Sequence, residues 1–251
     1  MNLNRHKLIQ IAKPLGMTEG NFRKCLDGRK TQTRRVIKPT PVNMVIKAST
    51  DGNWYDADCV NPGVRIKPRY KVGDICYLSE PVQIIELWPM SNNCHVRHFW
   101  APPKPKLAAQ GWDTFCRRDL TERDLDRIMK RKKGWDAPTT ARFMLKSFAR
   151  HFVEITGVRI ERLQDITDAD AINEGCDPTD GAFGTDAIDI REEMGMNIGT
   201  KPDGSVGILP PTPYPVRRFE CLWNSINRTE NTWDDNPWVW VFSFETVEAT
   251  S

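Results

Sequence analysis

The feature that most constrains the fold is the long segment of residues 151–163, in which apolar residues recur at nearly every second position. These residues are Phe152, Val153, Ile155, Val158, Ile160 and Leu163. Such alternation is typical of a strand with one buried face. A second apolar run, residues 238–244, has the composition of a core strand. Long, buried strands must therefore form the centre of this protein.

Shorter strand-like runs lie at residues 33–38, 44–48, 75–78 and 82–85. Three helices are predicted between the strands, each beginning at a threonine that fits an N-cap: Thr18, Thr121 and Thr167. Gly28 and Gly175 are expected to end the first and the third of these helices. Strands and helices do not alternate regularly, so the pattern favours an α+β fold built on a small β-barrel with flanking helices.

Composition narrows the class of protein. The chain has 251 residues, 39% of them apolar and 27% charged, which suits a protein with a genuine core. No run approaches the roughly 18 apolar residues of a membrane helix, and the first residues lack the order of a signal peptide. We therefore expect a cytoplasmic protein that does not enter a membrane.

The seven cysteines are scattered, which suits a reducing compartment. A metal site would have to involve Cys94, His95 and His98, with Cys116 as a fourth ligand. Their spacing fits no standard zinc pattern. The sequence therefore predicts no metal and no cofactor.

Although the net charge is only +3, basic and acidic residues are concentrated in different segments of the chain. Basic residues dominate residues 19–39 and 117–133, whereas acidic residues dominate residues 165–193. Basic patches on a nearly balanced protein are the usual mark of a polyanionic partner. Solvated helix faces would give the same pattern, so both interpretations stay open on charge alone.

The stretch of residues 28–35, Gly-Arg-Lys-Thr-Gln-Thr-Arg-Arg, connects a helix end to a strand. Lys30 and Thr33 are three residues apart on this connection, where their side chains can converge. A lysine beside a hydroxyl can act as base and nucleophile if neighbouring cations, such as Arg34 and Arg35, disfavour its ammonium form. The alternative is an exposed basic loop with ordinary threonines.

Residues 163–175 predict a strand end followed by a short helix. Glu174 lies in the last turn of this helix, where the negative end of the helix dipole disfavours the charged form of a carboxyl group. Such a carboxyl suits proton donation if it faces a pocket. The alternative is that Glu174 is simply exposed.

Together these stretches resemble the ASCH domain, a member of the PUA-like superfamily of small β-barrels associated with RNA. The residues that carry the resemblance are Gly28-x-Lys30-x-x-x-x-Arg35, Lys71-x-Gly73-Asp74 before a strand, and the helix of residues 163–175. Many ASCH domains carry Glu where this chain has Thr33. The stretch Gly28–Thr33 is instead similar to that of the bacterial N4-acetylcytidine amidohydrolases, and this similarity implies Lys30, Thr33 and Glu174 as the catalytic set.

The chain resembles still more closely the larger ASCH proteins of phages and prophages, in residues 27–35, 158–166, 222–227 and 236–240. The resemblance covers about residues 15–85, 145–176 and 217–245. It implies a single domain over residues 15–245 with two long insertions, at about 86–140 and 176–215.

The resemblance implies hydrolysis of an acylated exocyclic amine on a cytosine-type nucleoside or nucleic-acid base. The expected substrate-binding residues are Gly28, Arg29, Thr31, Arg34, Arg35 and Glu80. The partner would be a nucleoside or RNA, and nothing in the sequence indicates an oligomeric state.

Two other functions remain open. One is a module that binds RNA or a modified base without chemistry, with Trp88, Trp100 or Trp135 stacking on a base. The other is a structural or host-takeover accessory of a phage, which would keep the pocket only as a scaffold.

Overall fold

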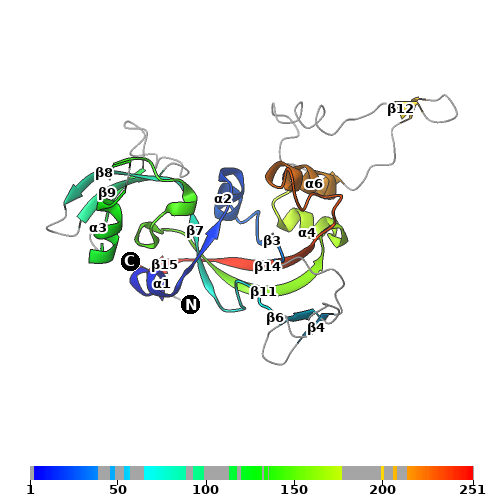
Figure 1. Cartoon of the computed structure of the whole chain (residues 1–251), viewed down its shortest axis with the longest axis horizontal. Coiled ribbons are helices and arrows are strands. Elements are labelled where there is room, and N and C mark those ends of the chain that lie inside the picture. The colour runs from blue at the N-terminus through cyan, green and yellow to red at the C-terminus, as the bar shows by residue number, and fades with distance from the viewer. Residues whose placement is uncertain are drawn as a thin grey trace. The chain divides into compact units, whose positions relative to one another are not determined.

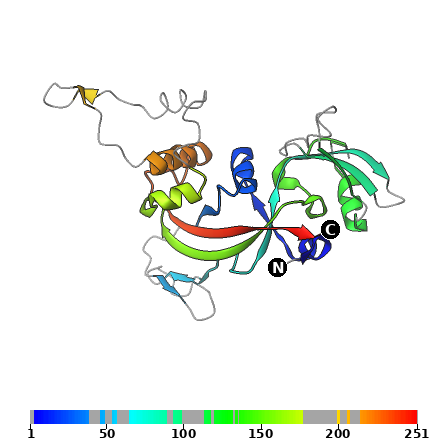
Figure 2. The same cartoon turned by 180° about the vertical axis from the view of Figure 1, so that it is seen from behind.

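The computed structural model describes residues 3–38, 46–48, 54–56, 65–88, 93–98, 113–117, 120–131, 133–134, 136–176, 199–200, 206–207 and 214–250. The chain divides into two compact units. Unit 1 comprises Met1–Gly28, Val72–Ile155 and Phe244–Ser251, and unit 2 comprises Arg29–Lys71 and Thr156–Ser243. The first predicted insertion therefore belongs to unit 1 and the second to unit 2. Figures 1 and 2 show the chain from two sides.

In the described part of unit 1, the helices are α1 (Arg5–Ile11), α2 (Glu19–Leu26) and α3 (Glu122–Met129), and 3-10 turns lie at residues 141–143 and 146–148. Its strands are β1 (Leu3–Asn4), β2 (Lys13–Gly16), β7 (Ile75–Ser79), β8 (Val82–Trp88), β9 (Asn93–His98), β10 (Asp113–Arg117) and β15 (Ala249–Thr250). It also holds the start of β11 (Phe152–Arg162) and the end of β14 (Trp238–Val247).

Unit 2 contains the remainder of β11 and β14 together with β3 (Gln32–Val36). Of its described residues, Asp168–Asn173 and Tyr214–Ile226 form the helices α4 and α6, and residues 163–165 form a 3-10 turn. Its short strands are β4 (Ile46–Ala48), β5 (Trp54–Asp56), β6 (Arg65–Ile66), β12 (Gly199–Thr200) and β13 (Val206–Gly207).

The principal sheet has five strands in the order β2-β7-β11-β14-β3. β2 runs parallel to β7, whereas β11 is antiparallel to β7 and β3 is antiparallel to β14, so the sheet is mixed. The two long strands that the sequence predicts, β11 and β14, are neighbours at its centre. The α+β class is confirmed, and the closed PUA-like barrel stays a prediction.

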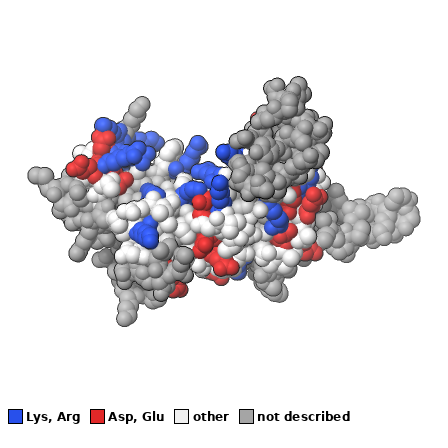
Figure 3. Space-filling model, turned by 90° about the horizontal axis from the view of Figure 1, so that it is seen from below, with Lys and Arg blue, Asp and Glu red and all other residues white. Residues whose placement is uncertain are grey.

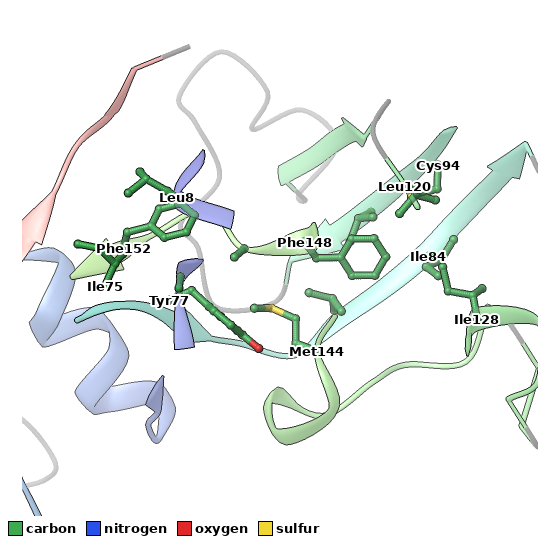
Figure 4. Packing of buried hydrophobic residues seen from close by; sticks show 14 residues of the cluster. Leu8, Ile75, Tyr77, Ile84, Cys94, Leu120, Ile128, Met144, Phe148 and Phe152 are labelled. Carbon is green, nitrogen blue, oxygen red and sulfur yellow. The ribbon is translucent and has the colours of Figure 1, made fainter. Parts of the chain in front are cut away.

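The core of unit 1 includes side chains of the antiparallel strands β8 and β9. Figure 4 shows its apolar side chains, which come from α1, α3, β7, β8, β9, β11 and the 3-10 turns. Ile84 of β8 and Ile128 of α3 are both 1% exposed and belong to the same buried cluster. Burial of one face of α3 therefore fixes which face of that helix meets solvent.

The core of unit 2 forms where α4 and α6 lie side by side, as both Figures 1 and 2 show. Ala171 of α4 and Phe219 of α6 belong to the same buried cluster as Val239 and Val241 of β14. These contacts hold the end of α4 in a defined place beside the sheet.

The predicted helix boundaries are confirmed. The side chain of Thr18 accepts a hydrogen bond from the amide of Asn21, and Thr167 and Thr121 cap α4 and α3 in the same way. Gly28 and Gly175 have φ of 72° and 88°, the left-handed conformation that favours glycine after a helix. The four short predicted strands also form, as β3, β4, β7 and β8.

Among the described residues, none of the helices combines the length and the apolar character that crossing a bilayer requires.

Candidate functional site

Lys30 lies on the connection between α2 and β3. Its side chain is only 2% exposed, so it points into unit 2 and not into solvent. The backbone amide of the next residue, Thr31, donates to the carbonyl of Asn173 at 2.8 Å. This bond ties the connection directly to the last residue of α4, and it brings Lys30 to the end of that helix.

Glu174 is the C-cap residue of α4, and the backbone around it has a well-defined geometry. The amide of Gly175 donates to the carbonyl of Ile172 at 2.8 Å, and the amide of Cys176 donates to that of Ala171 at 2.9 Å. These two bonds make a Schellman motif, which fixes the helix end. Glu174 is 3% exposed, so the alternative of an exposed glutamate is wrong.

Lys30 and Glu174 form a buried ion pair. Lys30 Nζ lies 2.5 Å from Glu174 Oε2 and also donates to the backbone carbonyl of Glu174 at 2.9 Å. A cation at a helix C-terminus is favourable both for the unpaired carbonyl groups and for the helix dipole. The exposed-loop alternative for Lys30 is therefore wrong as well.

Arg34 completes this arrangement from β3. Its side chain is fully buried, and Nη1 donates to Glu174 Oε1 at 3.1 Å. Nε and Nη2 donate to Glu161 Oε1 at 3.0 and 2.5 Å. The guanidinium also lies over the ring of Phe219, with 5.4 Å between its central carbon and the ring centroid. Arg34 thus holds Glu174 from one side while Lys30 holds it from the other.

Two further charged residues extend the cluster toward solvent: Arg159, whose side chain is 41% exposed, and Asp170, whose side chain is 17% exposed. Arg159 Nη2 donates to Asp170 Oδ1 at 2.8 Å, and Arg159 Nε donates to Glu161 Oε2 at 2.9 Å. Burial alone would raise the pKa of Asp170, but the charges of Arg159 and Arg34 and hydrogen bonds from Arg159 and Thr167 outweigh it. The net result is a pKa of Asp170 below its ordinary value.

The cluster is electrically balanced. Its cations are Lys30, Arg34 and Arg159, and its anions are Glu161, Asp170 and Glu174. Removing one partner of a buried pair leaves an uncompensated charge, which costs about 3–5 kcal/mol. The cluster therefore constrains both the fold of unit 2 and the position of every carboxylate in it.

Thr33 is buried, at 2% exposure, but it is not bonded to the other two predicted catalytic residues. Its Oγ1 accepts a hydrogen bond from Arg35 Nη1 at 2.8 Å. Successive side chains of a strand point to opposite faces, so Thr33 and Arg35 share the face opposite to that of Arg34. Among the described residues, no hydrogen bond joins Thr33 to Lys30 or Glu174.

Three predicted substrate-binding residues lie on or before this connection. Gly28 and Arg29 are exposed, and Thr31 is half-buried. The amide of Gly28 donates to the carbonyl of Cys25, and that of Thr31 is bonded to Asn173. These two amides are therefore committed to the fold, and neither is available to an oxyanion in this arrangement.

Glu80, the remaining predicted substrate-binding residue, lies in unit 1. Its carboxylate is fully buried and accepts two hydrogen bonds from the guanidinium of Arg150, both 2.6 Å long. A cationic partner for Glu80 therefore comes from a distant part of the chain. Its place in the site stays a prediction.

Only two of the four candidate metal ligands have side chains that the structure describes. Cys94 is buried, and His95 Nδ1 contacts Glu86 Oε2 at 2.8 Å, whereas the side chains of His98 and Cys116 lie outside the described residues. In the described part of the chain, no group of three or more His, Cys, Asp or Glu residues is placed to hold a metal ion. The side chains of Trp88, Trp100 and Trp135 also lie outside it.

The sequence analysis missed Glu161, Asp170 and Arg159 as members of the cluster. A signal for two of them was present. Apolar residues at 158 and 160 of the long strand leave Arg159 and Glu161 together on its other face. Opposite charges two residues apart on one face of a strand indicate an ion pair.

Comparison of the chain with protein-family models, with curated proteins and with solved structures finds no match.

Proposed function

We propose that this protein is an amidohydrolase that removes an acyl group from the exocyclic amine of a cytosine-type nucleoside or nucleic-acid base. The observation that carries the proposal is the buried contact between Lys30 Nζ and Glu174 Oε2. Two of the three residues that the family resemblance marks as catalytic thus meet, although 144 positions separate them in the sequence. Thr33, the third of these residues, is buried at the start of the same strand, with its hydroxyl bonded to Arg35 and not to the pair.

The Lys30–Glu174 pair can supply both a base and an acid. Transfer of one proton from Lys30 to the carboxylate gives a neutral amine and a protonated carboxyl, with no change in total charge. Thr33 Oγ1 accepts a hydrogen bond from Arg35 on the other face of β3, so this mechanism requires Thr33 to leave Arg35 and approach Lys30 when substrate binds. Lys30 then takes the hydroxyl proton of Thr33 as Oγ1 attacks the amide carbonyl. Glu174 gives its proton to the departing exocyclic nitrogen as the carbon–nitrogen bond breaks.

A water molecule completes the reaction. After a second proton transfer from Lys30 to Glu174, Lys30 takes a proton from water as the water oxygen attacks the acyl–threonine ester. Glu174 returns a proton to Thr33 Oγ1, and the carboxylic acid leaves. The sum of the steps is amide plus water giving acid plus amine, which balances in atoms and charge.

Arg34 serves this chemistry as a positioning residue. Its fully buried guanidinium bonds Glu174 and Glu161 at once, so it fixes the carboxylate that Lys30 contacts. Arg35, which is exposed and reaches Thr33 Oγ1, is the better candidate for binding a ribose or phosphate group. Both roles belong to the proposal.

The proposal includes an ASCH domain of the PUA-like type as the fold. The five-stranded mixed sheet, with β3 at its edge and α4 placed after the long strand β11, supports this assignment. Lys30 lies on the connection before β3, Thr33 on β3, and Glu174 at the end of the later helix α4. The family resemblance implies its catalytic residues in this same order along the chain.

The test is the release of acetate and cytidine from N4-acetylcytidine by the purified chain. Wild-type protein should release both products, and Lys30→Met should not. Lys38→Met is a matched control because Lys38 follows the same strand but is exposed. If wild type and Lys30→Met are equally inert where a known amidohydrolase works, the proposal fails.

One observation favours a second function, in which the same unit binds a modified base without chemistry. Thr33 makes no hydrogen bond to Lys30 or Glu174, so the pair can serve as a structural contact beside a binding surface. Binding of N4-acetylcytidine without turnover, unaffected by Thr33→Val, would establish this function in place of hydrolysis.

A further inference from the structure

The helix α3 in unit 1 carries a stripe of basic side chains that the proposed chemistry does not use. Arg123, Arg127 and Lys130 are all exposed. At about 100° per residue, they fall within an arc of about 60° around the helix. They span about 10 Å along its axis, since each residue adds 1.5 Å.

This stripe faces away from the core. Ile128 is 1% exposed, and Leu125 packs against the same apolar cluster, so these two residues mark the buried side of α3. On the helical wheel their mean direction is roughly opposite to that of the basic stripe. The packing of unit 1 therefore directs the basic side chains to solvent.

One of the three cations of the stripe is paired, and the other two lie on a helix that also carries Glu122, Asp124 and Asp126. Lys130 Nζ lies 2.7 Å from Asp126 Oδ1, but neither Arg123 nor Arg127 forms an ion pair with another described residue. Arg131, by contrast, donates to the carbonyl of Ala137 and to Thr139 Oγ1, so it serves the fold of the following turn. The two arginines are thus available to an anion from outside.

We propose that this face of α3 binds the sugar–phosphate backbone of a nucleic-acid strand. Arginine suits this role because its planar guanidinium offers two parallel donors to a phosphate. A row of cations along a helix matches a row of phosphates, and attraction of this kind is strong at low salt. Figure 3 shows Lys and Arg side chains at the left end and near the centre of the face drawn, with Asp and Glu side chains beside them.

The inference is independent of the proposed hydrolysis, because it concerns unit 1 and requires no chemistry. It is tested with the full chain by the fluorescence anisotropy of a short labelled single-stranded RNA over a range of salt concentrations. The double variant Arg123→Gln/Arg127→Gln should bind more weakly at every salt concentration. The slope of log affinity against log salt should flatten by about 0.7 for each lost phosphate contact, or about 1.4 in total.

A matched control is Lys7→Gln/Lys67→Gln, since both lysines are exposed and lie outside α3. Each double variant lowers the formal net charge by the same two units, from +3 to +1. Control binding equal to that of wild type, with a flattened slope only for the α3 variant, supports the proposal. Equal weakening of both variants, or no RNA binding at low salt, overturns it.

A second arm separates a nucleic acid from an anionic membrane. The same proteins are mixed with vesicles that contain phosphatidylserine, and sedimentation of the vesicles measures binding. Binding to vesicles that depends on Arg123 and Arg127, without binding to RNA, would contradict the proposal.

Discussion

Lys30 Nζ lies 2.5 Å from Glu174 Oε2, and both side chains are almost completely buried. The contact joins the connection before β3 to the C-cap of α4. It is supported by the amide bond from Thr31 to Asn173 and by the second cation, Arg34, on the other carboxylate oxygen. The pair is therefore held by backbone and side chains together, which is the kind of fixed geometry that proton transfer requires.

Glu174→Gln should destabilise unit 2. The substitution keeps the shape of the side chain but leaves the buried charges of Lys30 and Arg34 without their shared anion. A loss of about 3–5 kcal/mol in the free energy of unfolding is expected. Chemical denaturation measures it.

The control for this substitution is Glu245→Gln, which changes an exposed glutamate on β14. Its effect should stay within about 0.5 kcal/mol, as for most surface substitutions. Equal stability of Glu174→Gln and wild type would show that the Lys30–Glu174 contact is not formed in solution.

Thr33→Val should abolish turnover of N4-acetylcytidine and leave the fold intact. Valine keeps the branched shape that suits a strand but lacks the hydroxyl that attacks the substrate. Thr156→Val, at an exposed position of β11, is the matched control and should retain full activity. Steady-state kinetics measures both. Turnover by Thr33→Val would mean that water, activated by Lys30, is the nucleophile.

Arg34→Lys should lower kcat while changing KM little. A lysine keeps the charge but cannot bond Glu161 and Glu174 at once, so Glu174 loses its fixed position. Arg23→Lys is the control, because Arg23 forms an exposed ion pair with Glu19. A raised KM with unchanged kcat would instead indicate that Arg34 contacts substrate.

The lowered pKa of Asp170 predicts a pH-dependent contribution to stability. In the unfolded chain an aspartate has its ordinary pKa of about 3.9. Because the folded pKa is lower, Asp170 stabilises the folded state above that value, and this contribution is lost as pH falls through the folded pKa.

The difference in unfolding free energy between wild type and Asp170→Asn should therefore be largest near neutral pH and shrink below about pH 4. Arg159→Gln should remove part of the same pH dependence, since the charge of Arg159 contributes to the lowered pKa. Denaturation curves over this pH range measure both effects. A constant difference between wild type and Asp170→Asn would contradict the account.

Local signals in the sequence predict the elements well. Thr18 and Gly28 bound α2, and Thr167 and Gly175 bound α4, because caps and left-handed glycines act within a few residues. The alternation of residues 151–163 likewise predicts β11. Each of these patterns acts through interactions within one turn of a helix or within one strand, so it can be recognised from neighbouring residues alone.

The partners of buried charges could not be predicted from local patterns. Glu161 and Asp170 meet Arg34 only after β11, α4 and β3 have packed together. The family resemblance assigned Arg34 to substrate binding, whereas in the structure its side chain is fully buried, with the guanidinium over the ring of Phe219. The separation of Thr33 and Arg34 onto opposite faces follows from strand geometry, once β3 is known to begin at Gln32.

The central claim, that Lys30 and Glu174 act together as base and acid, is tested most directly by the rate of cytidine formation from N4-acetylcytidine in four proteins. These are wild type, Lys30→Met, Glu174→Gln and the double variant, each compared at a temperature where it is folded. Because the proposed mechanism passes a proton between the two residues, each single variant should be as slow as the double variant. Losses that simply multiply in the double variant, or full activity in either single variant, would contradict the claim.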